Sequence, residues 1–315
     1  MTDVEAGREA IQIMGSHTIT ALQKYMDEKG ASQVAVARAC GFSSPVISQI
    51  LHGEYKGDMA KVLKAIQDFL ALEEEREDSF TSSKFVRTGQ ADDVLIVCSL
   101  SHTNKFIGLV QARAGLGKTS ALNEYASRRS GVCFITASTW NCSRGAIALL
   151  LTRAVRVSTT YTTMTSAVEE VINKLGGGSL VIIDEAQHLT RETLDGLRYI
   201  HDVAKVGLVL SGTLQVSARM ADKRIGINYE QLASRIGIRR TLSETIGKED
   251  VKKILGQAAP NANGEVLDYC WKKANSPGAY RTMMRYIQVA VAKANAKKEP
   301  VGLKHFQAAE EILMV

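Results

Sequence analysis

The sequence predicts an α/β fold in which a parallel sheet lies between helices, with helical regions before and after it in the chain. From about residue 94, apolar β-rich runs alternate with helical stretches, an order typical of a doubly wound sheet. Most of these runs lack polar alternation, as expected of central parallel strands that are covered on both faces. The runs are residues 106–110, 132–136, 180–183, 206–210 and 236–242.

Helical patterns occupy both ends of the chain. Before about residue 70 apolar residues recur at helical spacing, as at Ile19, Leu22 and Met26, and after about residue 245 the strand-like runs stop. The acidic run of residues 73–78 and the serines after it favour an extended linker, because like charges repel. We therefore predict a helical domain (1–72), a linker (73–88), the α/β core (89–245) and a helical lid (246–315).

Length, composition and charge indicate a soluble globular protein. The 315 residues suggest two or three domains, and 45% hydrophobic with 23% charged residues is typical of a soluble globular chain. The net charge of +6 fits a polyanionic partner, or simply a basic surface. No apolar run approaches the length of a membrane span, and the acidic first five residues do not resemble a signal peptide. Five cysteines without a C-x-x-C pair favour reduced thiols in a cytoplasmic protein over a zinc site.

A glycine-rich run with the spacing of a phosphate-binding loop (P-loop, or Walker A) follows the first strand-like run and opens a helical stretch, residues 120–128. Glycines let the backbone wrap around phosphates, and the following helix presents free N–H groups. We expect Lys118 to reach the β- and γ-phosphates of ATP and the Thr119 hydroxyl to ligate Mg²⁺. The predicted nucleotide-binding residues are Ala112, Arg113, Ala114, Gly115, Leu116, Gly117, Lys118, Thr119 and Ser120, with Ala112 in place of the usual first glycine.

Two adjacent carboxylates follow the third strand-like run, residues 180–183. A buried parallel strand delivers Asp184 to the edge of the sheet beside the phosphates, where it can hold Mg²⁺ through water. Glu185 can then polarise the attacking water. A strand that merely happens to end in Asp-Glu is the alternative, and the P-loop about 65 residues earlier argues against it. Together the two motifs (Walker A and Walker B) predict an ATPase that uses ATP and Mg²⁺.

The run Ile183-Asp184-Glu185-Ala186-Gln187-His188-Leu189 resembles the second motif of AAA+ ATPases in the transposition-regulator group. That group includes the phage Mu B protein, its Tn7-type relatives and the target-site ATPases of insertion sequences. The resemblance continues in residues 206–213, which look like the fourth core strand and place Thr213 at the sensor-1 position near the γ-phosphate. It covers most of the chain, because the helical N-terminal region also matches the arrangement in Mu B.

The same resemblance implies catalytic roles for two arginines. Arg235, in Leu232-Ala233-Ser234-Arg235-Ile236, matches the arginine finger that reaches the nucleotide of a neighbouring subunit. Arg281, in Pro277-Gly278-Ala279-Tyr280-Arg281, matches the sensor-2 arginine of the helical lid. A guanidinium can stabilise charge developing on the γ-phosphate. The alternative for each is a solvated charge, beside Arg239 and Arg240 or beside Arg285.

The N-terminal region resembles the repressor-like helix-turn-helix of many phage proteins. Ser32 is a candidate N-cap of one helix, residues 41–43 form a tight turn, and Pro45 lies near the start of a second helix. The residues expected to face DNA are Ser43, Ser44 and Gln49, with Lys56 on a phosphate. Few basic residues flank the second helix, so a helical domain that binds protein is the alternative.

A second DNA-facing surface is predicted in the α/β core. Arg144 starts the helix after the second strand, and Arg156 and the polar stretch 158–163 end it. In related ATPases this region faces DNA that runs through a helical assembly. Arginines beside hydroxyl groups suit phosphate contacts that carry no sequence information. A plain polar surface loop is the alternative.

The resemblance implies an ATPase that binds double-stranded DNA with little regard to sequence, forms a helical homo-oligomer (a filament) on it and presents it to a partner transposase in a bacterial cytosol. A nucleotide-switched helix-turn-helix regulator and a helicase-loader-like ATPase remain alternatives. Binding to random duplex, with and without ATP, separates the first two, because a regulator prefers one operator.

Overall fold

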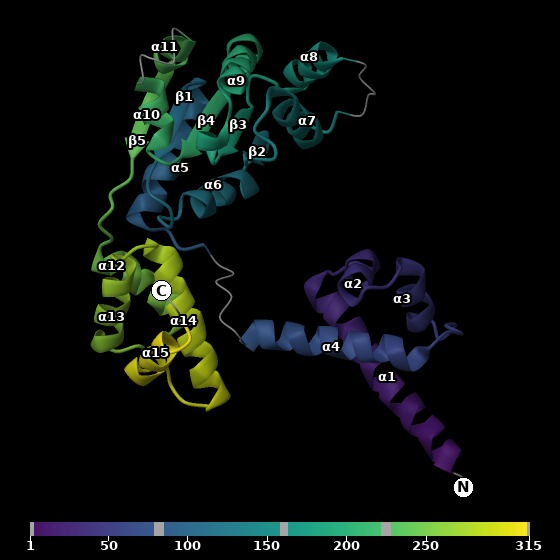
Figure 1. The fold of residues 1–315 in the computed structure, drawn as a ribbon. Coiled ribbons are helices and arrows are strands. Elements are labelled where there is room, and N and C mark those ends of the chain that lie inside the picture. The colour runs from purple at the N-terminus through teal and green to yellow at the C-terminus, as the bar shows by residue number, and fades with distance from the viewer. Residues whose placement is uncertain (1–2, 79–84, 158–162, 222–227, 314–315) are drawn as a thin grey trace. The chain divides into compact units, whose positions relative to one another are not determined.

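The computed structural model describes residues 3–78, 85–157, 163–221 and 228–313. It divides into two compact units, Met1–Thr81 and Ser82–Val315. Both are drawn in Figure 1, where the first unit runs from purple to blue. The first unit is all helical, and the second contains every strand of the described chain.

Four helices build the N-terminal unit, namely α1 (Asp3–Lys29), α2 (Gln33–Cys40), α3 (Ser44–Leu51) and α4 (Met59–Asp78). Its core consists of Leu22, Val36, Ala37, Ile47, Ile50, Val62 and Ile66. The predicted helical character is confirmed, and α1 is the longest of the four helices, with 27 residues. The apolar periodicity that indicated a helix is confined to its C-terminal half, where Leu22 packs into this core.

The predicted linker begins too early. Helix α4 continues through the acidic run to Asp78, because glutamate and arginine are good helix formers and outweigh the mutual repulsion of the carboxylates. Residues 79–84 of the predicted linker lie outside the described residues, and residues 85–88 precede the next helix without regular structure.

All five strand-like runs form strands of one parallel sheet in the order β2-β3-β4-β1-β5. The strands are β1 (Ile107–Gln111), β2 (Val132–Thr136), β3 (Leu180–Asp184), β4 (Gly207–Gly212) and β5 (Ile236–Thr241). The central strands β1, β3 and β4 are buried at every residue, as their unbroken apolar character indicated. The α/β prediction is confirmed.

Helices cover both faces of the sheet (Figure 1). One layer contains α7 (Arg144–Ala154), α8 (Met164–Lys174) and α9 (Arg191–Ala204), whose apolar residues share a core with alternate residues of β1, β3 and β4. The other layer contains α5 (Gly89–Asn104) and α6 (Lys118–Ser127). There Gly108 makes room for α5, since a Cβ on it would lie 2.7 Å from Val97 and 2.4 Å from Ser101. The short element η1 (Ala186–His188) contacts β4, and α10 (Gln215–Ala221) contacts η1 and α11 (Asn228–Ala233).

The chain after the sheet is helical, as predicted. Its helices are α12 (Lys248–Ala258), α13 (Gly264–Ala274), α14 (Ala279–Ala296) and α15 (Leu303–Glu310). They pack around the fully buried side chains of Met283, Ile287 and Phe306. No single helix among the described residues is long and apolar enough to cross a membrane; only the bent pair α2–α3, taken together, meets that length and composition.

Candidate nucleotide site

The glycine-rich run forms a loop between β1 and α6, at the carboxyl edge of the sheet. Gly115 and Gly117 have φ angles of +89° and +80°, which disfavour any side chain. A Cβ on Gly115 would also lie 2.0 Å from the carbonyl oxygen of Gly278, the residue just before α14. Ala112 is not among the residues with positive φ, so alanine fits where the usual motif has glycine.

The loop lines a cavity of about 290 Å³. Its walls are Ala114, Gly115, Leu116, Gly117, Lys118, Thr119, Ser120, Glu185, Thr213, Tyr280, Arg281 and Met284. Two of the predicted nucleotide-binding residues, Ala112 and Arg113, lie behind the loop, where their carbonyl oxygens accept hydrogen bonds from Lys118 Nζ at 3.0 and 3.1 Å. The structure thus brings the two sequence motifs and the predicted sensor residues to one cavity.

The Lys118 ammonium group is largely withdrawn from water, with 7% of the residue exposed. Burial lowers its pKa, against the raising effect of the nearby Asp184 and Glu185 carboxylates, while Arg281 adds to the lowering. Two carbonyl oxygens are its hydrogen-bond partners. A buried cation satisfied only by neutral carbonyls is well suited to bind a phosphate.

Asp184 is fully buried at the end of β3 and accepts two hydrogen bonds. Thr119 Oγ1 donates to Asp184 Oδ2 at 2.6 Å, and Ser211 Oγ donates to Oδ1 at 2.8 Å. A hydroxyl and a carboxylate oxygen so close together are hard donors of the kind that Mg²⁺ prefers. No group of three or more His, Cys, Asp or Glu side chains that could hold a metal occurs among the described residues.

Glu185 follows Asp184 with a φ angle of +56°, an uncommon conformation for a residue with a side chain. Its carboxylate accepts a hydrogen bond from Gln187 Nε2, and the residue lines the cavity. Thr213 lies opposite, just beyond the end of β4, and its backbone N–H donates to Gln187 Oε1 at 3.1 Å. Its hydroxyl oxygen is buried and has no hydrogen-bond partner among the described residues.

The two predicted arginines are placed differently. Arg281 lines the cavity from α14. Arg235, just before β5, is outside it: its Nε donates to Asp202 of α9 at 3.1 Å and its Nη1 donates to the carbonyl oxygen of Gln231 at 3.0 Å. A single chain therefore assembles every predicted catalytic residue except Arg235.

Comparison with known proteins agrees with this geometry. Residues 102–220 match the family model of an AAA domain, and residues 234–312 match that of the Mu B transposition protein, C terminal. The chain carries an AAA ATPase domain and is similar to the Mu B transposition proteins. The ATP-dependent target DNA activator B of Escherichia phage Mu is 29% identical over 273 residues, covering 85% of each chain. The Mu-like prophage FluMu DNA transposition protein B of Haemophilus influenzae is 27% identical, covering 79% of this chain and 86% of that protein.

Among solved structures, domain III of the replication initiation protein DnaA from Thermotoga maritima is similar, with a TM-score of 0.50 and 15% identity. The match covers 72% of this Mu B-like chain and 94% of the DnaA domain. At this identity the similarity concerns the fold alone.

Several site residues of this Mu B-like chain have no assigned role in the sequence analysis. Ser211 and Gln187 bind the carboxylates of Asp184 and Glu185 respectively, and Tyr280 and Met284 line the cavity. Tyr280 also donates to Gln90 Oε1 of α5 at 2.9 Å, so that α14 is tied to the core. Ser211 could have been found, because it immediately precedes Gly212-Thr213 at the end of the fourth apolar run. The contact made by Gln187 depends on tertiary structure.

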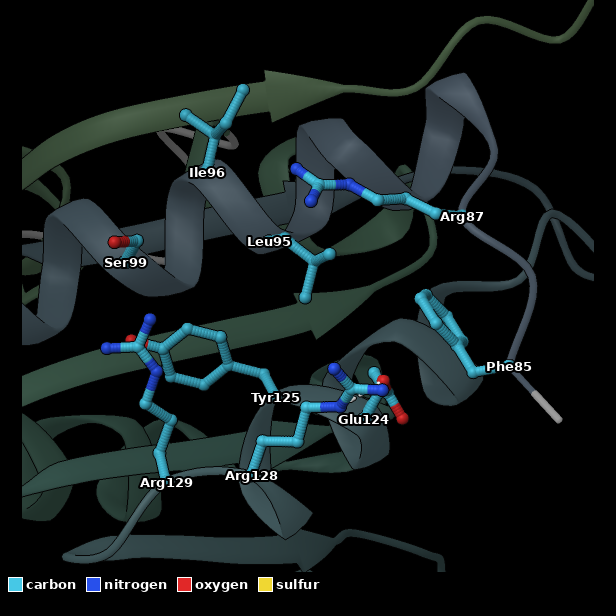
Figure 2. Close-up of a pocket in the computed structure, with 9 residues that line it drawn as sticks. All are labelled: Phe85, Arg87, Leu95, Ile96, Ser99, Glu124, Tyr125, Arg128 and Arg129. Carbon is cyan, nitrogen blue, oxygen red and sulfur yellow. Dashed lines mark ion pairs between the residues drawn. The ribbon is translucent and has the colours of Figure 1, made fainter.

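A larger cavity, of about 520 Å³, lies between α5 and α6 (Figure 2). Arg87, Arg128 and Arg129 surround it, with Arg128 paired to Glu124 and Arg129 placed over the Tyr125 ring at 5.2 Å. No P-loop residue lines it. The P-loop residues predicted to bind nucleotide line the smaller cavity instead.

The predicted DNA-facing residues of the N-terminal unit lie on and after α3. Helices α2 and α3 are joined at 109°, within the range of helix-turn-helix motifs, and Gly41 takes the left-handed conformation in the turn with φ of +75°. Ser32 caps α2 by accepting from the N–H of Ala35 at 3.2 Å. Ser43, Gln49 and Lys56 are exposed and Ser44 is half-buried. Their contact with DNA stays a prediction.

In the second unit, Arg144 is the first residue of α7 and is exposed. Arg156 follows the end of α7, exposed and with a φ angle of +54°. Of the polar stretch predicted beside them, residues 158–162 lie outside the described residues. The DNA-binding role of this surface also stays a prediction.

Proposed function

We propose that this chain is an ATP-dependent DNA-binding ATPase that oligomerises on duplex DNA of any sequence and delivers it as target to a partner transposase, which it activates. The observation that carries the proposal is the similarity to ATP-dependent target DNA activators over 85% of both chains. The match of residues 234–312 to the Mu B C-terminal model supports the same reading. All five cysteines are free, in keeping with a bacterial cytosol.

The nucleotide cavity supports ATP as the cofactor, with Mg²⁺. Lys118 and the N–H groups at the start of α6 would bind the phosphates, while Thr119 and Asp184 would hold Mg²⁺. When bound, the metal supplies positive charge that stabilises the transferring phosphoryl group. Glu185 would orient and deprotonate the attacking water, and Thr213 and Arg281 would contact the terminal phosphate.

The position of Arg235 supports assembly as part of the function. Its side chain is outside the cavity of its own chain and is 39% exposed. The hydrogen bonds to Asp202 and Gln231 use Nε and Nη1, and neither uses the terminal nitrogen Nη2. A neighbouring subunit that presents its nucleotide to this side chain would receive a positive charge beside the γ-phosphate. Hydrolysis would then depend on neighbours, as expected of an ATPase that acts as a filament.

DNA would be bound mainly through phosphate contacts of the ATPase unit, in the segment from Arg144 to Thr163. These contacts carry no sequence information, so binding would be sequence-tolerant and would weaken steeply with salt. The N-terminal unit would add affinity through α3.

A nucleotide-switched regulator is the second candidate, favoured by the 109° junction of α2 and α3. The two functions differ in sequence preference and in the unit that binds DNA.

The test compares the full chain with a variant lacking residues 1–80 on random duplex DNA, with and without a slowly hydrolysed ATP analogue. We expect ATP-dependent filaments from both proteins by electron microscopy, with weaker binding for the shortened one. Filaments that form at one sequence only, or not at all once residues 1–80 are removed, would favour the regulator. Stimulation of strand transfer by a purified Mu-type transposase tests the delivery step.

A further inference from the structure

The short turn η1 places Gln187 between two parts of the nucleotide site. Its amide nitrogen donates to the Glu185 carboxylate, and its amide oxygen accepts from the backbone N–H of Thr213 at 3.1 Å. A carboxylate only accepts and an N–H only donates, so these partners fix the orientation of the amide. Gln187 therefore joins the residue that faces the attacking water to the loop that faces the terminal phosphate.

The surroundings of Gln187 are built for this contact. Gly212 makes room for it, because a Cβ at that position would lie 2.5 Å from Gln187 Oε1 and 2.7 Å from the Val216 side chain. On the other side, Arg219 Nη1 donates to the Gln187 carbonyl oxygen at 2.6 Å. The backbone of Gln187 is therefore held by Arg219 of α10, while its side chain reaches from η1 to the residue that follows β4.

Thr213 supplies the connection to the nucleotide. It lines the cavity, and its buried hydroxyl oxygen has no hydrogen-bond partner among the described residues. A buried hydroxyl without a partner is costly, and a phosphate oxygen in the cavity can satisfy it. Movement of Thr213 toward such an oxygen carries its own N–H with it, and that N–H is bound to Gln187.

We propose that Gln187 is a positioning residue that couples occupation of the terminal-phosphate site to the placement of the Glu185 carboxylate. The inference rests on the proposed catalytic role of Glu185. Without a terminal phosphate, Gln187 holds the carboxylate toward β4. Contact of Thr213 with the phosphate shifts the amide, and Glu185 moves with it to face the attacking water. Hydrolysis is thereby restricted to chains that hold a triphosphate in place.

The test replaces Gln187 in the full chain, with ATPase rates measured on DNA and ATP affinity by calorimetry. Gln187→Met keeps the length of the side chain and removes both hydrogen bonds. We expect kcat to fall by about 10- to 100-fold, since a misplacement of about 1 Å can cost 10²-fold. KM and ATP affinity should stay near wild type, because Gln187 does not line the cavity. His188→Ala, at the exposed neighbouring residue, is the matched control and should retain the wild-type rate.

The separation of kcat from KM is a readout that a merely structural role would not give. A general loss of packing around η1 would weaken ATP affinity and hydrolysis together, whereas loss of positioning should lower kcat alone.

A double-mutant cycle with Thr213→Val tests the coupling. If Gln187 acts through Thr213, the two losses should be strongly non-additive. Additive losses, or wild-type kcat in Gln187→Met, would overturn the inference. Glu185→Gln is measured in parallel: a wild-type rate there would remove the proposed role of Glu185 itself, and the inference with it. An inactive Glu185→Gln beside a fully active Gln187→Met would reject only the coupling.

Discussion

The P-loop cavity and the segment that carries Arg235 differ in whether the predicted site residues already lie together within one chain. In the cavity region Lys118 and Asp184 are buried, and Lys118, Thr119 and Asp184 are already hydrogen-bonded to one another or to the loop. Arg235 is partly exposed and faces Asp202 on another element. Under the proposed function, binding of nucleotide would belong to the single chain, whereas the full hydrolytic site would need a second copy.

The largest effect should come from removing the cation of the cavity. Lys118→Ala deletes a buried charge that we expect to face two phosphates, and we predict loss of ATP affinity of about 10²-fold or more, which abolishes measurable binding. Calorimetry with Mg²⁺-ATP measures it, and Lys252→Ala, an exposed lysine of α12, is the control. Tight binding by Lys118→Ala would show that the cavity is not the nucleotide site.

Removal of Arg235 should separate binding from hydrolysis. Arg235→Ala should bind ATP as a monomer with wild-type affinity, yet hydrolyse it about 10³-fold more slowly when assembled on DNA. Arg239→Ala removes an exposed arginine of β5 as the matched control. Mixing Arg235→Ala with Lys118→Ala protein should restore part of the activity, because each contributes what the other lacks. Failure of the mixture at concentrations where both assemble would count against action in trans.

A smaller effect is expected at the DNA surface. Arg144→Ala combined with Arg156→Ala should weaken binding to random duplex by about tenfold and lower the salt slope by about 2. Removing Arg128 and Arg129, which lie beside the cavity of Figure 2, deletes the same charge elsewhere and serves as the control. Equal losses in both variants would mean that overall charge, and not this surface, governs binding.

The smallest effect concerns pH. Burial lowers the pKa of the free Lys118 ammonium group, and bound phosphates should raise it, since they favour the charged form. ATP affinity should then be highest at pH values below the lowered pKa of free Lys118. It should decline as the pH rises through that pKa, by at most about tenfold per pH unit. Calorimetric titrations from neutral to alkaline pH measure this decline. Lys118→Arg, whose side chain keeps its charge, should bind more weakly but without the decline.

Local patterns were sufficient for the strands and for the residues of the two motifs. Where an apolar run ends in glycine or in a carboxylate, the end of the strand can be predicted from the sequence. The P-loop can be recognised from consecutive residues alone. The sequence does not indicate helix α5, because its apolar residues lie on its exposed side as well as on its buried side. Ile96 is 52% exposed while Val94 and Val97 are buried, so no apolar stripe at helical spacing marks the buried face. The contact of Gln187 with Thr213, 26 residues later, needs the fold to be known.

The close approach of Gly115 to Gly278 links two parts of the site without any side chain. At Gly115 the glycine-rich loop meets the start of α14, one of the C-terminal helices, through main-chain atoms, with no space for a methyl group. A displacement of those helices cannot be absorbed by a rotamer change and must be taken up by the loop that holds the phosphates. If the cavity holds the nucleotide, as we propose, its entry and departure would be mechanically linked to the C-terminal helices, and any residue larger than glycine at position 115 would force the loop and α14 apart.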